Sequence, residues 1–134
     1  MTSPDPITWL EAFAGHVRDR DLAAGRQLFA PGATGFGTRA ARVDGLDDLV
    51  DRQWRPIWTS TRGFRFDVDD AVVATAADAS QTTVATTWSS EGVADDDTTF
   101  GRRGRATVVL VPDPASPVGL VAVHSHFSED PDPS

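Results

Sequence analysis

The sequence contains no cysteine, lysine, asparagine or tyrosine. The absence of cysteine excludes disulfides and thiolate metal ligands, and it fits a reducing compartment. No stretch approaches the ~20 consecutive apolar residues that a membrane-spanning helix needs. The polar, proline-rich start does not resemble a secretory signal. We therefore expect a cytoplasmic protein that does not associate with membranes.

Positive charge is also scarce. The sequence has 12 basic residues, all of them arginine, and 20 acidic residues, which gives a net charge of −8. A chain this acidic repels a phosphate backbone, so a nucleic-acid partner is not expected. A GC-rich coding sequence explains the use of arginine in place of lysine, and adaptation to high salt is the alternative explanation for the acidity.

The length of 134 residues fits one domain with a substantial core. We predict a single domain over residues 1–134. Prolines and acidic residues at both ends predict loose tails over residues 1–6 and 129–134.

Apolar residues in the first half of the chain recur at helical spacing. A first helix is predicted from Ile7, because Trp9, Phe13, His16 and Val17 fall on one face of such a helix. The side chains on this face are expected to point into the protein.

Two further helices and a short strand are predicted before Gly63. Asp21 is suited to capping a helix over 22–29, and a short strand is expected at 35–38. Apolar residues at three- and four-residue intervals predict another helix over 46–58. Pro56 is expected to kink that helix or to end it early, because proline lacks the amide donor.

After Gly63 the apolar period changes from helical to two, which is typical of half-buried strands. The predicted strands cover residues 64–74 with a bulge at 69–70, then 81–90, 105–111 and 120–128. Long bulged strands curl a sheet. The predicted fold is therefore α+β: a cone-shaped, curved antiparallel sheet whose concave face is covered by about three helices, with a pocket at the open end.

Several short motifs carry a family resemblance over residues 7–128. They are Asp21-Leu22, Leu28-Phe-Ala-Pro31, Gly37-Thr38, Gly45, Trp54, Trp58, 105–110 and Val123-His-Ser-His-Phe-Ser128. Together they resemble a SnoaL-like branch of the nuclear-transport-factor-2 and ketosteroid-isomerase superfamily. The closing motif also resembles the end of the association domain of calcium/calmodulin-dependent kinase II. The resemblance implies a cystatin-like α+β cone, a homodimer and a ligand cavity, but no single reaction.

The residues of isomerase catalysis are not matched. The resemblance places Gly37 or Thr38 at the position of the aspartate base and Phe13 at that of the tyrosine, and no tyrosine exists elsewhere. Ketosteroid-isomerase chemistry is therefore not expected. In the kinase-associated domain, arginines gather around a small carboxylate, but Phe127 replaces one of them here.

Large rings are numerous for a domain of this size, and they can either fill the core or line a pocket. Arg105 could clamp an anionic group or pair with an acidic residue such as Asp67. The predicted ligand-binding residues are Trp9, Phe13, Phe36, Trp54, Trp58, Trp88, Arg105, Ser125 and Phe127. The expected ligand is a small hydrophobic or weakly acidic molecule.

The three histidines offer the remaining acid–base chemistry. His16 is the candidate catalytic base, although a histidine on an apolar face is more often a core residue. His124 and His126 share one face of the last strand, where a zinc site would need a third ligand. A structural role for this pair is favoured, and no metal site or cofactor is predicted.

Three functions remain open at this point. The first is a small-molecule-binding domain with an aromatic-lined pocket. The second is a cyclase or isomerase that uses His16 or Arg105 on a hydrophobic substrate. The third is an assembly module, in which the outer face of the sheet and His124/His126 form a homodimer interface.

Overall fold

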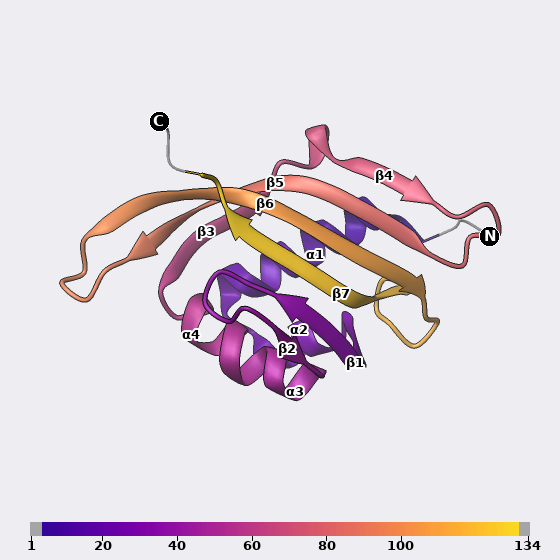
Figure 1. Cartoon of the computed structure of the whole chain (residues 1–134), viewed down its shortest axis with the longest axis horizontal. Helices are drawn as coiled ribbons and strands as arrows, with labels where there is room; N and C mark the ends of the chain where they lie inside the picture. Colours follow the sequence, from indigo (N-terminus) through magenta and orange to yellow (C-terminus); the bar gives the residue numbers. More distant parts are fainter. Residues whose placement is uncertain (1–3, 132–134) are drawn as a thin grey trace.

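A curved sheet arches over the helices in the computed structural model, which describes residues 4–131 (Figure 1). The strand order is β2-β1-β7-β6-β5-β3, and β4 pairs with β5 beside that path. All strand pairs are antiparallel except β1 with β7, which is parallel. The strands are β1 (Phe29–Phe36), β2 (Val43–Asp44), β3 (Thr61–Phe66), β4 (Val72–Thr75), β5 (Thr82–Val93), β6 (Thr99–Pro112) and β7 (Leu120–Glu129).

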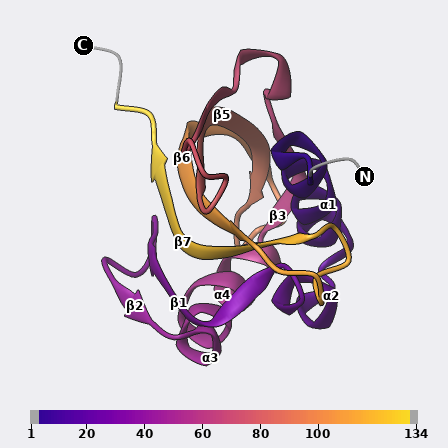
Figure 2. The ribbon, with the colours of Figure 1, turned by 90° about the vertical axis from the view of Figure 1, so that its right-hand side faces the viewer.

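The helices form three segments against the inside of the curve. The first two are α1 (Pro6–Asp19) and α2 (Leu22–Arg26); the third joins α3 (Leu46–Leu49), the π-helical turn η1 (Val50–Trp54) and α4 (Arg55–Trp58). Figure 2 shows β5 and β6 curling around the side of the molecule that holds α1. The predicted α+β fold, a curved sheet covered by three helical segments, is confirmed, except that the pair of β1 and β7 is parallel in a sheet predicted to be antiparallel.

Helix α1 is fixed at both ends by local chemistry. The Asp5 carboxylate accepts a hydrogen bond from the Ile7 amide at 2.9 Å, and Arg20 ends the helix in a left-handed conformation. The guanidinium of Arg18 donates to the Phe64 carbonyl oxygen at 2.9 Å, which ties α1 to β3. Asp5 and Pro6 therefore belong to the folded domain and not to the predicted tail.

Pro56 disturbs the third helical segment, but neither ends it nor shortens it. The chain widens into the π-helical turn η1, and the Arg55 amide donates to the carbonyl of Val50. The helix then continues through Pro56 to Trp58. Since proline has no amide to donate, the wider turn just before it accommodates the missing hydrogen bond.

Several predicted boundaries were wrong. The second helix ends at Arg26, and β1 starts at Phe29 rather than near residue 35. The bulge expected at 69–70 is a 3-10 turn, Val68–Asp70, which separates β3 from β4. Strand β6 likewise starts at Thr99, six residues before the predicted strand.

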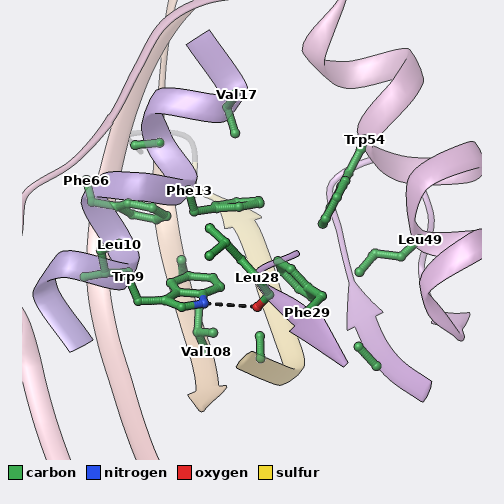
Figure 3. Close-up of a cluster of buried hydrophobic side chains, with 14 of the residues drawn as sticks. Trp9, Leu10, Phe13, Val17, Leu28, Phe29, Leu49, Trp54, Phe66 and Val108 are labelled. Carbon is green, nitrogen blue, oxygen red and sulfur yellow. Dashed lines mark hydrogen bonds between the residues drawn. The ribbon is translucent and has the colours of Figure 1, made fainter. Parts of the chain in front are cut away.

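The base of the core is an apolar cluster between α1 and the sheet (Figure 3). Trp9 is completely buried and its Nε1 donates to the Leu28 carbonyl oxygen at 3.0 Å. The ring of Phe13 stacks on Trp9 with centroids 5.3 Å apart, and Phe29 packs against both rings. This cluster holds α1, β1 and the sheet together.

At the other end of the chain, the predicted tail also starts too early. Glu129 belongs to β7, where it pairs with Gly104 of β6. The remaining tail prediction over 132–134, like that over 1–3, lies outside the described residues.

Among the described helices, none is both long and apolar enough to cross a bilayer. The cytoplasmic location stays a prediction.

Candidate functional site

A small cavity lies between the helices and the concave face of the sheet, with a volume of about 50 Å³. It is smaller than the ~150 Å³ cavity that admits benzene in an engineered protein. Its lining residues come from α1, η1, α4, β3, β5, β6, β7 and the segment after β1. They are Phe13, Val17, Thr38, Gln53, Trp54, Ile57, Trp58, Thr61, Phe64, Trp88, Ser90, Arg102 and Phe127.

Aromatic side chains fill most of the space around this cavity. Trp54 and Trp58 stack with ring centroids 4.8 Å apart, and Phe13 packs against both. Phe127 lies 6.2 Å from Phe64, centroid to centroid. The walls are therefore mostly apolar, and the cavity is the small volume that these rings do not fill.

Two buried polar side chains face this apolar space without a partner. Gln53 is 4% exposed, and its Oε1 accepts no hydrogen bond from the described part of the chain. The same holds for the Oγ of Ser90, a residue that is 9% exposed. A methyl group at position 37 would collide with the Gln53 amide, so Gly37 lets the backbone lie directly against that amide.

Arg102 brings a positive charge to the same cavity. Its side chain is 14% exposed, and its guanidinium carbon lies 5.8 Å from the ring centroid of Trp88. The Nη2 atom donates to Oε1 of Glu129 at 2.7 Å and approaches the Thr38 hydroxyl at 3.5 Å. Arg102 thus links the cavity to the end of β7.

An open groove of about 390 Å³ adjoins the cavity. The two spaces share Thr38 and Phe127 in their linings, and the groove is also lined by Phe36, His126 and Glu129. Since Arg102 lines the cavity and Glu129 lines the groove, their ion pair lies at the boundary between the two.

Five of the nine predicted ligand-binding residues line the cavity: Phe13, Trp54, Trp58, Trp88 and Phe127. They come from α1, η1, α4, β5 and β7, so the fold brings together rings from across the sequence. Whether they bind a ligand stays a prediction.

The other four lie elsewhere. Trp9 belongs to the closed base of the core, and Ser125 is fully buried outside the cavity lining. Phe36 is 39% exposed and lines only the groove. Arg105 is exposed. Alternate residues of β6 face opposite sides of the sheet, so Arg102 faces the cavity and Arg105, three residues later, faces the other side.

His16, the predicted catalytic base, does not line the cavity either. It is half-buried on α1, whose fully buried face consists of other residues: Trp9, Leu10, Phe13, Ala14 and Val17. Its position lies at the edge of that buried face, and a catalytic role for His16 stays a prediction without support from the cavity lining.

His124 and His126 share one face of β7, as predicted, and the Phe36 ring packs edge-on against both imidazoles at 4.9 and 5.5 Å. The His124 Nδ1 lies 2.8 Å from the Thr34 hydroxyl. Burial, together with the neighbouring His126, lowers the pKa of the His124 imidazole. Within residues 4–131, no three histidine or acidic side chains gather as metal ligands.

Sequence reasoning missed Gln53, Ser90 and Arg102. The strand over 81–90 was predicted, and its alternation places Ser90 on the same face as Trp88, so this signal was available. Arg102 lies before the strand predicted over 105–111, because Gly101 and Gly104 interrupt the alternation in the first part of β6. Gln53 fits the three- and four-residue spacing of the apolar residues over 46–58, so its place on the buried face was also available from the sequence, but a polar residue does not count in a pattern of apolar ones.

The same arrangement of a curved sheet and covering helices occurs in solved proteins of the nuclear-transport-factor-2-like superfamily. A solved protein of that superfamily, from Salmonella enterica serovar Typhimurium, superposes with a TM-score of 0.77 at 17% identity, covering 95% of this chain and 89% of its own. The chain belongs to the SnoaL-like domain family, whose model matches residues 8–132.

Two other similar structures show how widely this fold is used. The S. rosetta CaMKII hub gives a TM-score of 0.75 at 21% identity, covering 97% of this chain and 99% of its own. A ketosteroid isomerase-like protein from Erwinia carotovora gives 0.75 at 9% identity, with 94% of each chain covered. These identities establish the fold alone. No curated protein matches the sequence significantly.

Proposed function

We propose that this chain is a small-molecule-binding domain whose cavity takes the polar end of a ligand. The observation that carries the proposal is the pair of buried atoms without partners, Gln53 Oε1 and Ser90 Oγ, in one cavity. A buried hydroxyl or amide left without a hydrogen bond costs about 1–3 kcal/mol. A ligand that bonds to both atoms would recover that cost.

The size of the cavity limits which part of the ligand enters it. A volume of about 50 Å³ is well below the roughly 300–1,000 Å³ of sites that enclose a whole drug-sized ligand. A small polar group with one or two carbons fits, and an attached apolar tail would lie in the adjoining groove of about 390 Å³.

The alternative of a cyclase or isomerase has less support. Its two candidate residues, His16 and Arg105, are absent from the cavity lining. The Arg102 side chain offers charge stabilisation, but no described carboxylate or imidazole lines the cavity beside it as a base. Binding without strong catalysis is therefore the function we favour.

The proposal is tested with short primary amides and alcohols of increasing tail length, from propanamide to hexanamide and from propanol to hexanol. Tryptophan fluorescence and the melting temperature report binding, since Trp54, Trp58 and Trp88 line the cavity. Affinity should rise with tail length as the groove fills. If no compound changes either signal in the wild-type protein, the proposal is wrong and water alone satisfies the two atoms.

The matched variant is Gln53→Met, which keeps the length of the side chain but removes its polar atoms. We expect this variant to melt at a higher temperature without ligand and to lose affinity for the amides at least about tenfold, because one hydrogen bond in an apolar site is lost. Equal affinity of the variant and the wild type would contradict the proposed site.

A second function has independent support: association of two copies through the outer face of the sheet. Phe36 is 39% exposed, and its ring packs edge-on against His124 and His126 on that face. Solved relatives of the same fold include CaMKII hub and association domains. Sedimentation at micromolar concentration should show a dimer, and Phe36→Glu should shift it to monomer; a wild-type monomer would contradict this function.

A further inference from the structure

The charge of Arg102 is already balanced inside the protein. Its Nε and Nη2 atoms donate to the same Glu129 oxygen, at 3.1 and 2.7 Å, and its guanidinium lies over the Trp88 ring. The arginine side chain is 14% exposed, whereas that of Glu129 is 53% exposed. The cation therefore faces the cavity, and the anion stands at the groove, where the tail of a ligand would lie.

A carboxylate ligand would meet an unfavourable field at this site. To bind Arg102 it would have to displace Glu129 or lie beside it, and like charges at close range in a partly desolvated site repel strongly. The net charge of −8 adds to this repulsion over longer distances. The remaining polar atoms of the cavity, on Gln53 and Ser90, are uncharged.

We infer that the site selects neutral ligands bearing a hydroxyl or primary amide group, and that Glu129 is the residue that excludes carboxylates. This inference rests on the proposed function, since it concerns the ligand of the same cavity. Gln53 offers an amide and Ser90 a hydroxyl, so the two side chains can both accept from and donate to a neutral polar group.

The ion pair could instead serve only to join β6 to β7. In that case, removing the charge of Glu129 would change stability but not the preference between a neutral ligand and its charged isostere. The preference is therefore the readout that separates a selective role from a purely structural one.

Butanamide and butanoate form a matched pair, because they have the same shape and differ in charge. Their dissociation constants are measured at constant ionic strength and neutral pH by chemical-shift titration of the whole chain. The variant is Glu129→Gln, which keeps hydrogen-bonding atoms near Arg102 but removes the negative charge. The control is Asp78→Asn, an equal change in net charge at an exposed turn near the other end of β5.

We expect the wild-type protein to bind butanamide at least about tenfold more tightly than butanoate. In Glu129→Gln the two affinities should become similar or reverse, because Arg102 is left free to pair with the carboxylate. Asp78→Asn should keep the wild-type ratio.

Two results would overturn the inference while leaving the proposed function intact. One is wild-type protein that binds butanoate as tightly as butanamide. The other is a ratio that does not change in Glu129→Gln. If neither compound binds to the wild type or to Glu129→Gln, the cavity is not a site for small polar ligands, and the proposed function fails together with the inference.

Discussion

Trp9 and Gln53 are both almost completely buried, at 0% and 4% exposure, but they differ in whether their polar atoms form hydrogen bonds. The Trp9 indole donates to the Leu28 carbonyl oxygen, whereas Oε1 of Gln53 has no partner in the described chain. The first belongs to the closed base of the core and the second to the cavity near the groove. This difference fits our proposal that the base serves stability and the cavity end serves binding, although the buried Ser125 Oγ also lacks a partner among the described residues and lies outside the cavity lining.

The largest expected effect tests the closed base. Trp9→Ala should lower the free energy of unfolding by about 3–5 kcal/mol, because it empties a tightly packed site and removes a hydrogen bond. Thr38→Ala, at the boundary between cavity and groove, should cost less than about 1 kcal/mol. Urea denaturation measures the free energy of unfolding of both variants. Equal losses of stability would show that the closed base and the cavity end contribute equally to stability.

The next prediction tests whether the strands beside the cavity are as closely packed as the base. A methyl group on Gly104 would collide with the backbone oxygen of Ser128 and with the Trp88 indole, whereas at Gly101 nothing lies within 4 Å. Gly104→Ala should therefore destabilise the protein by about 1–3 kcal/mol, and Gly101→Ala should have little effect. Similar melting temperatures for the two variants would mean that β6 and β7 can separate locally.

Removing the Ser90 hydroxyl is expected to have a smaller effect on stability, and to leave stability unchanged or raise it. Ser90→Ala removes a buried hydroxyl without a partner, so the unliganded protein should be equally stable or more stable by up to about 1 kcal/mol. Thr61→Val is the control, since its hydroxyl donates to the Ile57 carbonyl oxygen at 2.7 Å and its loss should cost about 1 kcal/mol. A marked destabilisation by Ser90→Ala would mean that its hydroxyl does have a stabilising partner.

The smallest effect concerns pH and the outer face. Because burial lowers the pKa of His124, the unfolded chain takes up this proton at a higher pH than the folded one. Stability should therefore decrease as the pH falls through about 6.5, the ordinary value for histidine, and level off below the folded-state pKa. Melting curves from pH 7.5 to 5.5 test this, and His124→Gln should show a smaller decrease. An unchanged slope would assign the decrease to other groups.

The sequence predicted the fold and much of the apolar wall of the cavity, but little of its polar end. Ring positions such as Phe13 and Trp88 follow from hydrophobic periodicity, which sets the face of a helix or strand that is buried. Arg102 was missed because the glycines of β6 obscure the alternation. Gln53 was missed although it lies four residues after Leu49 and three after Val50, because hydrophobic periodicity counts apolar residues and passes over a polar one on the same face.

The pairing of β1 with β7 has a consequence for how the chain folds. Thr34 and His124 lie side by side in the sheet although 90 residues separate them in the sequence. Contacts between such distant segments form late and slow folding, because a long loop must close first. During synthesis, the edge of β1 that pairs with β7 stays unpaired until β7 has left the ribosome. We therefore expect chaperones to bind at this edge, or newly made chains to associate wrongly there.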